Sequence, residues 1–193
     1  MLGLKLPTDP RWVEIVEENI NEILTDHAYC EQKAASYAIS LVIKFHHIQE
    51  IVEKLTDLAH EELEHFKMVT EKIYERGEQL GQERRDPYVQ DLMSQVNRGG
   101  NMEQNLCDRL LIAAMIEARS CERFKVLSEN IKDPELAEFY NELMASEARH
   151  YTMFLKLAKK HAPSIDVDKR WKEVLDIEAK IILNYGKRET IHG

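Results

Sequence analysis

Two motifs of the form Glu-x-x-His, at residues 62–65 and 147–150, place a carboxylate and an imidazole on one side of a predicted helix. About thirty residues before each motif, a lone glutamate also interrupts an apolar helical pattern. Carboxylates and imidazoles are the ligands with which four-helix proteins hold two iron or two manganese ions. The sequence therefore predicts a carboxylate-bridged two-metal centre for redox chemistry with dioxygen. Its candidate ligands are Glu31, Glu62, His65, Glu117, Glu147 and His150.

The motif spacing alone is a weak indicator. With 25 Glu and 8 His in 193 residues, roughly one Glu-x-x-His motif is expected by chance, and three occur. The third, Glu189 to His192, lies at the C-terminus without a matching apolar pattern, and we interpret it as coincidence. A single motif of this kind on a helix usually belongs to a solvated face.

The position of the glutamates within apolar helix faces is more informative. Steps of three and four residues trace one face of a helix, and each of the four glutamates has apolar residues on both sides along that face. A buried carboxylate without compensation costs several kcal/mol, and divalent cations supply such compensation. Buried salt bridges among the same side chains, without a metal, are the alternative.

The two halves of the chain repeat this arrangement. Glu31 precedes Glu117 by 86 residues, and the two Glu-x-x-His motifs are 85 residues apart. Local sequence identity between the halves is low, so the repeat is one of architecture and ligand placement: a helix with Glu, a turn, and a helix with Glu-x-x-His.

Composition indicates an all-α protein with a single domain, residues 1–193. Charged residues make up 32% of the chain, glycine and proline are sparse, and no apolar run reaches the roughly 20 residues that span a bilayer. Residues 1–10 lack the features of a secretory signal, so we expect a cytoplasmic protein without a membrane partner. The three cysteines, which we expect to be reduced core residues rather than metal ligands, are Cys30, Cys107 and Cys121.

The predicted helices form two antiparallel hairpins joined by one long crossover, which is the connectivity of a ferritin-like four-helix bundle. A short helix is expected from Pro10 to about Leu24, and the crossover, with an amphipathic piece at 88–96, covers about 77–101. Asp133 and Pro134 have the residue types that begin a helix. The four long helices are expected at 26–47, 48–76, 102–131 and 134–161, followed by a basic C-terminal helix at about 166–185.

Charge is distributed unevenly along the chain, whose net charge is −9. Residues 1–148 carry 16 basic and 29 acidic side chains, whereas residues 149–193 carry 10 basic and 6 acidic. This asymmetry indicates either an anionic partner near the C-terminal helix or simply a solvated helix face.

Four segments, namely 26–35, 60–66, 114–124 and 146–151, resemble the tRNA hydroxylase family of MiaE type, and the similarity covers essentially the whole chain. The resemblance implies a non-haem di-iron monooxygenase. Such an enzyme hydroxylates the isopentenyl group of 2-methylthio-isopentenyl-adenosine at position 37 of tRNA, using dioxygen and an external electron donor. The six candidate ligands match the family's iron ligands, whereas Glu64 stands where a second histidine commonly precedes the ligand histidine.

The resemblance also implies two partners, a tRNA anticodon loop and an unidentified electron-transfer protein, and no DNA. A protein of net charge −9 is a poor general nucleic-acid binder, so a local basic patch must supply the phosphate contacts. The candidates for this patch are Arg84, Arg85, Arg98, Lys159, Lys160, Lys169, Arg170 and Lys172.

Three questions stay open at this level. The enzyme could instead be a di-iron oxidase acting on a small molecule or acyl substrate, or the chain could be a non-catalytic protein that handles iron or peroxide. Alanines beside the ligands could leave room for a substrate or permit close helix packing. His27, one turn before Glu31, could be an outer partner of a metal ligand or a core histidine satisfied elsewhere.

Overall fold

The computed structural model describes residues 2–96, 100–185 and 190–192, and the regular structure in these ranges is entirely helical. The expected all-α class is confirmed. Its contacts divide the chain into two compact units, which we describe separately. The helices are α1 (Trp12–Glu18), α2 (Ile20–Lys44), α3 (Gln49–Glu75), α4 (Pro87–Met93), α5 (Met102–Asn130), α6 (Pro134–His161) and α7 (Val167–Ile181), with a 3-10 turn η1 (Ile182–Asn184).

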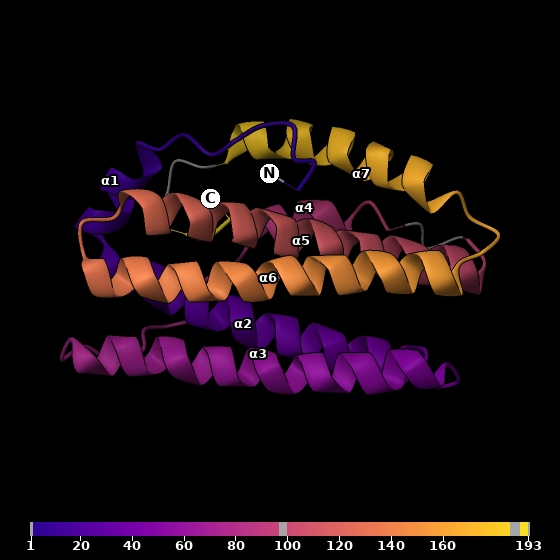
Figure 1. Cartoon of the computed structure of the whole chain (residues 1–193), viewed down its shortest axis with the longest axis horizontal. Helices are drawn as coiled ribbons and strands as arrows, with labels where there is room; N and C mark the ends of the chain where they lie inside the picture. Colours follow the sequence, from indigo (N-terminus) through magenta and orange to yellow (C-terminus); the bar gives the residue numbers. More distant parts are fainter. Residues whose placement is uncertain (1, 97–99, 186–189, 193) are drawn as a thin grey trace. The chain divides into compact units, whose positions relative to one another are not determined.

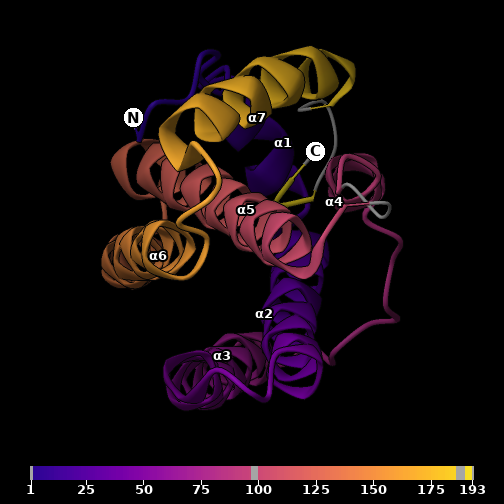
Figure 2. The same cartoon turned by 90° about the vertical axis from the view of Figure 1, so that its right-hand side faces the viewer.

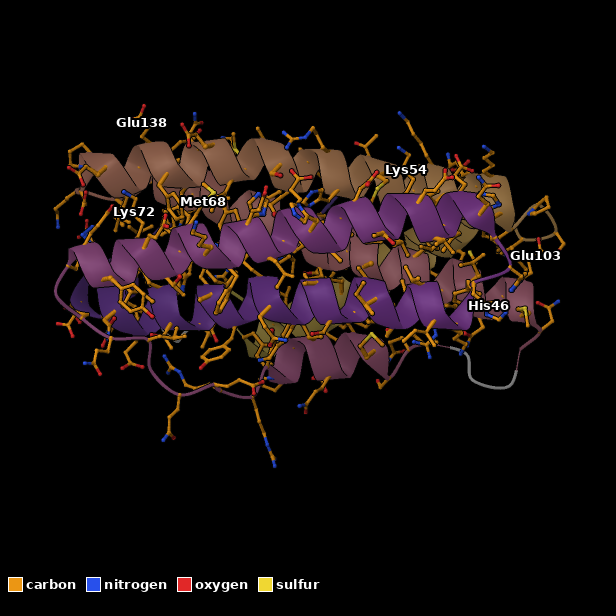
Figure 3. The ribbon with its side chains drawn as sticks, turned by 90° about the horizontal axis from the view of Figure 1, so that it is seen from below. His46, Lys54, Met68, Lys72, Glu103 and Glu138 are labelled. Carbon is orange, nitrogen blue, oxygen red and sulfur yellow. The ribbon has the colours of Figure 1, made fainter. Side chains whose placement is uncertain are left out.

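The smaller unit contains α2 and α3, which form an antiparallel hairpin (Figure 1). Figure 3 shows the two helices side by side, with His46 near the turn that joins them and Lys72 toward the other end of α3. Leu41 and Phe45 from the end of α2, and Ile51 and Leu55 from the start of α3, are fully buried. The apolar faces predicted from the sequence therefore pack as expected at the closed end of the hairpin.

Helix α3 ends in a turn that requires glycine. Gly77 has a φ of +75°, its N–H donates to the carbonyl of Tyr74, and the N–H of Glu78 donates to the carbonyl of Ile73. These two bonds form a Schellman motif, which satisfies carbonyls left over at the helix end. The predicted end of this helix at about residue 76 is confirmed.

The larger unit contains α4 to α7 and the N-terminal residues. Helices α5 and α6 form its antiparallel hairpin, and α7 runs along α5 (Figure 2). Asp133 caps α6 as predicted, since its side chain accepts hydrogen bonds from the N–H groups of Glu135 and Leu136. The chain thus has two helical hairpins and one long connection between them, which is the predicted ferritin-like connectivity.

Buried ion pairs fix α7 against α5. Arg119 of α5 donates to Glu178 of α7 at 2.6 Å, and both side chains are fully buried. The same guanidinium donates to Glu122 at 3.0 Å and to the carbonyl of Leu6 at 3.1 Å. Because these bonds come from several directions, they restrict the rotation of α5 about its axis and so fix which face carries Glu117.

The N-terminal part departs from the prediction. The short helix α1 ends at Glu18 rather than near Leu24, and the first long helix begins at Ile20 rather than Asp26 and ends at Lys44 rather than His47. The break falls at Asn19, whose side chain makes no capping hydrogen bond. The C-terminal helix is also shorter than expected, because α7 gives way to a 3-10 turn after Ile181. The single-domain organisation stays a prediction.

None of the helices in the described ranges is both long enough and apolar enough to cross a membrane.

Candidate functional site

The smaller unit holds three of the six predicted ligands in one cluster, which we call the first half-site. Glu31 comes from α2, and Glu62 and His65 come from α3. All three are buried, with exposed fractions of 4%, 1% and 7%. The His65 Nδ1 atom lies 3.5 Å from Glu62 Oε2 and 3.7 Å from Glu31 Oε2. One atom from each residue can therefore serve a common ion, since these atoms lie within 4.8 Å of one another.

The charges in the first half-site stabilise one another. Burial by itself raises the pKa of Glu31. Hydrogen bonds between its carboxylate and the side chains of His27, His65 and Glu62 outweigh this effect and hold the pKa well below its usual range. Burial alone would lower the pKa of His65, and the two carboxylates instead raise it to about 10. Without a metal ion, the imidazolium of His65 compensates part of the negative charge of the buried carboxylates.

His27 also belongs to this cluster. Its side chain is fully buried, and its Nε2 atom lies 2.7 Å from Glu31 Oε1. Of the two interpretations that the sequence left open, the structure therefore favours an outer partner of a candidate ligand.

The larger unit holds the other three predicted ligands, which we call the second half-site. Glu117 comes from α5, and Glu147 and His150 come from α6, with exposed fractions of 6%, 3% and 4%. The His150 Nδ1 atom lies 3.9 Å from both Glu117 Oε2 and Glu147 Oε1. Their possible ligand atoms also lie within 4.8 Å of one another. Each hairpin thus presents two carboxylates and one imidazole.

The donor set of each half-site suits a divalent transition metal. Two carboxylates that share a buried site favour a cation, because neither is solvated. Imidazole and carboxylate together suit iron and manganese better than the softer metals that select thiolates. The residues present therefore fit the metal centre that the sequence predicts.

Cys107 and Cys121 do not compete for this role. All three cysteines are free of disulfide bonds, and burial raises the pKa of both Cys107 and Cys121 to about 11. Cys121 lies one turn after Glu117, but its Sγ donates to the carbonyl of Met144 at 3.3 Å. Cys107 and Cys121 therefore have the environment of core residues, whereas Cys30 is only half-buried, so the expectation of a core position is not met there.

Two of the arginines proposed to contact RNA have protein partners. Arg84 Nη2 lies 2.8 Å from the side-chain carboxylate of Glu22 and donates to the backbone carbonyl of Glu22 at 3.2 Å. Arg170 donates through Nε to the buried Asp108 at 2.8 Å. These bonds attach the crossover to α2 in the smaller unit and α7 to α5 in the larger one.

The other proposed contacts differ in their environment. Lys159 pairs with Asp168 at 2.6 Å, with both side chains more than half exposed. Arg98 lies outside the described residues. The remaining candidates, all exposed, are Arg85, Lys160, Lys169 and Lys172.

The structure also places His192 in a cluster that the sequence did not reveal. His192 Nδ1 lies 2.7 Å from Asp86 Oδ2, and its Nε2 lies 3.2 Å from Ser120 Oγ. Its ring stacks on Tyr88 with centroids 5.3 Å apart. The motif that ends at His192 gave no sign of these contacts, because the partners of His192 are distant in sequence. Glu189, the other residue of that motif, lies outside the described residues.

Comparisons with known proteins identify the family of the chain. A family model described as tRNA-(MS[2]IO[6]A)-hydroxylase (MiaE) matches residues 2–193. The tRNA 2-(methylsulfanyl)-N(6)-isopentenyladenosine(37) hydroxylase of Pseudomonas putida is 36% identical over 190 residues, covering 98% of this chain and 91% of the relative. The protein of the same name from Salmonella typhimurium is 29% identical, covering 98% of this chain and 87% of the relative.

One solved structure is similar along nearly the whole chain. It is titled "Protein 43 with aldehyde deformylating oxygenase activity from Synechococcus", has a TM-score of 0.90 and is 36% identical. The match covers 98% of this chain and 95% of that one. The fold is therefore shared along the full length, and with the full-length family match the chain belongs to the MiaE family of tRNA hydroxylases.

Proposed function

We propose that the chain is a di-iron monooxygenase that hydroxylates the isopentenyl group of 2-methylthio-isopentenyl-adenosine at position 37 of tRNA, with dioxygen and an external electron donor as co-substrates. The observation that carries the proposal is the pair of buried half-sites, each with two carboxylates and one imidazole from an antiparallel hairpin. Family membership and the names of the relatives support the choice of substrate.

All six ligands are proposed to hold the two ions. Glu31, Glu62 and His65 come from one hairpin, and their counterparts stand 85 or 86 residues later in the other. When bound, two ferrous ions supply the electrons that activate dioxygen for insertion of one oxygen atom into a C–H bond. The residues of the chain hold the ions, orient the ligands and keep water away from them.

The surroundings of the second half-site support the exclusion of water. Leu110, Ala113 and Ala114 lie on α5 before Glu117, and all are buried, with exposed fractions no higher than 4%. A dry, apolar environment strengthens electrostatic interactions with the ligands and protects a reactive centre from side reactions. Such an environment also suits an apolar isopentenyl group.

RNA binding is proposed to depend on the exposed cations of the larger unit. Lys169 and Lys172 lie on the first turns of α7, next to the half-buried Trp171, whose ring is 5.8 Å from that of Tyr151. Lysines contact phosphates and aromatic rings can stack on unpaired bases, so this combination suits a single-stranded RNA loop. Replacing both lysines with alanine should weaken tRNA binding. The slope of the logarithm of the binding constant against the logarithm of salt concentration should fall by the amount expected for about two lost phosphate contacts.

A second candidate function follows from the similar structure that is titled with aldehyde deformylating oxygenase activity. The chain could accordingly act on an aldehyde or another acyl-derived small molecule at the same two ions. Turnover of a free long-chain aldehyde, without salt-sensitive binding of tRNA, would favour this candidate.

A nucleoside analysis tests the principal proposal. In the source organism, provided that it makes the methylthio-isopentenyl nucleoside, deletion of the gene should remove the hydroxylated nucleoside from tRNA digests while the precursor accumulates. Complementation with the intact gene should restore the hydroxylated form, whereas a Glu147→Ala gene should not. An unchanged nucleoside profile in the deletion strain would contradict the proposal.

A further inference from the structure

Helix α6 separates its charges along its length. Counting aspartate, glutamate, lysine and arginine, residues 134–147 carry four acidic and no basic side chains, whereas residues 148–161 carry four basic and no acidic ones. The helix dipole favours cations near a helix C-terminus, but this effect is confined to about the last turn. The dipole therefore accounts for Lys159 and Lys160 and leaves Arg149 and Lys156 unexplained.

Three of these four cations lie on one face of α6. Lys156 and Lys160 follow Arg149 by 7 and 11 residues, which returns them to nearly the same side of a helix with about 3.6 residues per turn. All three are exposed, and they follow one another at intervals of about 10 and 6 Å along the axis. We call these three residues the α6 basic stripe. Lys159 is not included, because it pairs with Asp168 of α7 at 2.6 Å.

The stripe begins at the level of the second half-site. In sequence Arg149 lies between two of the proposed ligands, Glu147 and His150, and both of these are buried. Arg149 Nη2 donates to Ser146 Oγ at 3.0 Å, which holds the side chain along the helix. A helix with its side chains is about 10–12 Å across. A phosphate bound by Arg149 would therefore lie about one helix thickness from the proposed ions.

The stripe adjoins the aromatic and basic surface of α7 within the larger unit. Tyr151 of α6 and Trp171 of α7 are half-buried, with their ring centroids 5.8 Å apart. Lys169 and Lys172 lie on either side of Trp171 in the sequence of α7. Cations bind phosphates and aromatic rings stack on unpaired bases, so this surface suits a single RNA strand. An acidic protein would match the charge of the surface but not its aromatic rings.

We propose that the α6 basic stripe binds phosphates of the tRNA substrate and seats its strand beside the second half-site, with Arg149 as the anchor nearest to the ions. The inference rests on the proposed function, which supplies the RNA. A guanidinium is a planar fork of donors that matches a phosphate, whereas a lysine acts as a point charge. Arg149 therefore fixes the position of one nucleotide, and Lys156 and Lys160 add affinity along the strand.

The salt dependence of binding tests the stripe. Iron-loaded protein is titrated into labelled tRNA that carries the methylthio-isopentenyl nucleoside, and fluorescence anisotropy measures binding at several salt concentrations. Arg149→Ala and Lys156→Ala should each weaken binding. In each variant the slope of the logarithm of the binding constant against the logarithm of salt concentration should fall by about 0.7, as expected for one lost contact to a single strand.

Two controls accompany this measurement. The same fall in slope is expected with tRNA that lacks the modification, because phosphate contacts carry no sequence information. Lys54→Ala removes an exposed lysine of α3 (Figure 3) and should leave the slope unchanged.

Turnover kinetics test the role of Arg149 as the anchor. Lys156→Ala should raise the KM for tRNA, whereas Arg149→Ala should raise KM and also lower kcat, because the nucleoside is held less precisely. Arg149→Lys keeps the charge and should restore the salt slope but only part of kcat. Iron content and circular dichroism of each variant should match the wild type, which separates substrate binding from damage to the neighbouring ligands.

The outcomes distinguish this inference from the proposed function. If the wild type holds two irons but neither binds tRNA nor forms the hydroxylated nucleoside, the proposed function is wrong and the inference fails with it. If the wild type does both, and Arg149→Ala and Lys156→Ala keep its salt slope, only the stripe is wrong. An equal fall in slope in Lys54→Ala would mean that net charge alone acts, which also overturns the inference. Slower reduction of the irons by a ferredoxin in the two stripe variants, with tRNA binding intact, would assign the stripe to an electron donor instead.

Discussion

Glu31 Oε2 and His65 Nδ1 lie 3.7 Å apart although they belong to different helices and are 34 residues apart in sequence. Both side chains are buried, so their attraction is weakly screened. In the metal-free protein this pair joins α2 to α3 at the middle of the hairpin. The same two atoms are available to a metal ion, which would replace the proton of the imidazolium.

The stability of the metal-free protein should therefore depend on the proton of His65. Its pKa is about 10 in the folded protein and 6.5 in the unfolded chain. A raised pKa contributes stability that is fully present below pH 6.5 and is lost as the pH rises through about 10. Urea unfolding of the apo-protein should give a lower midpoint at pH 9.5 than at pH 6.5. The difference between these two midpoints should be smaller in His65→Gln, which lacks the imidazole.

Equal losses in the wild type and in His65→Gln would show instead that other groups cause the alkaline destabilisation.

Loss of a ligand should remove metal without unfolding the hairpins. Glu147→Ala leaves His150 and Glu117 without their neighbouring carboxylate, and the second half-site then offers only two ligands. The variant should bind fewer than two irons per chain while its helicity stays close to that of the wild type. Iron content by atomic absorption and circular dichroism measure the two quantities. The exposed Glu138 of the same helix (Figure 3) gives the matched control, because Glu138→Ala should bind iron normally.

Two irons per chain in Glu147→Ala would mean that this residue is not a ligand.

The buried pair of Arg119 and Glu178 should be important for stability. Glu178→Ala leaves a buried guanidinium with one carboxylate fewer, and breaking a buried pair typically costs about 3–5 kcal/mol. The double variant Arg119→Met, Glu178→Met removes both charges and should recover part of this loss. Chemical unfolding of the three proteins measures the free energies. The exposed Lys132 provides a comparison, since Lys132→Ala should produce little change.

A single variant as stable as the wild type would show that Glu178 is not required to attach α7 to α5.

Gly77 should resist substitution for a conformational reason alone. A Cβ atom at this position would meet nothing within 4 Å, but the φ of +75° disfavours any residue with a side chain. Gly77→Ala should therefore lower the free energy of unfolding by about 1–2 kcal/mol. Gly77→Asn should cost less, because asparagine adopts this conformation more readily. Urea midpoints of the two variants measure the difference, and equal losses would point to a cause other than backbone conformation.

The candidate ligands could be predicted from the sequence because charged residues within apolar helix faces are conspicuous. Helix ends at Gly77 and Asp133 could also be predicted, since local residue types determine them. The break at Asn19 has no such signal. Trp12 and Val16 are buried in the same region, so tertiary packing rather than local sequence ends α1.

Pairings between distant residues were beyond sequence reasoning. Arg119 and Glu178 are 59 residues apart, and the chain has too many charged residues for spacing to identify this pair. Helical spacing places His27 near Glu31 without showing which atoms meet, so the sequence leaves two interpretations of His27 open. Side-chain geometry decides such questions, and periodicity does not contain it.

The most direct measurement of the central claim is oxygen transfer to tRNA. Iron-loaded protein, an electron donor and tRNA that carries the methylthio-isopentenyl nucleoside are incubated under heavy-isotope dioxygen, and the nucleosides are analysed by mass spectrometry. We expect a nucleoside heavier by one oxygen atom, with that atom drawn from the labelled gas. We expect no such product when Glu147→Ala replaces the wild type. Unmodified tRNA after incubation with protein that holds two irons, or a product oxygen derived from water, would contradict the central claim.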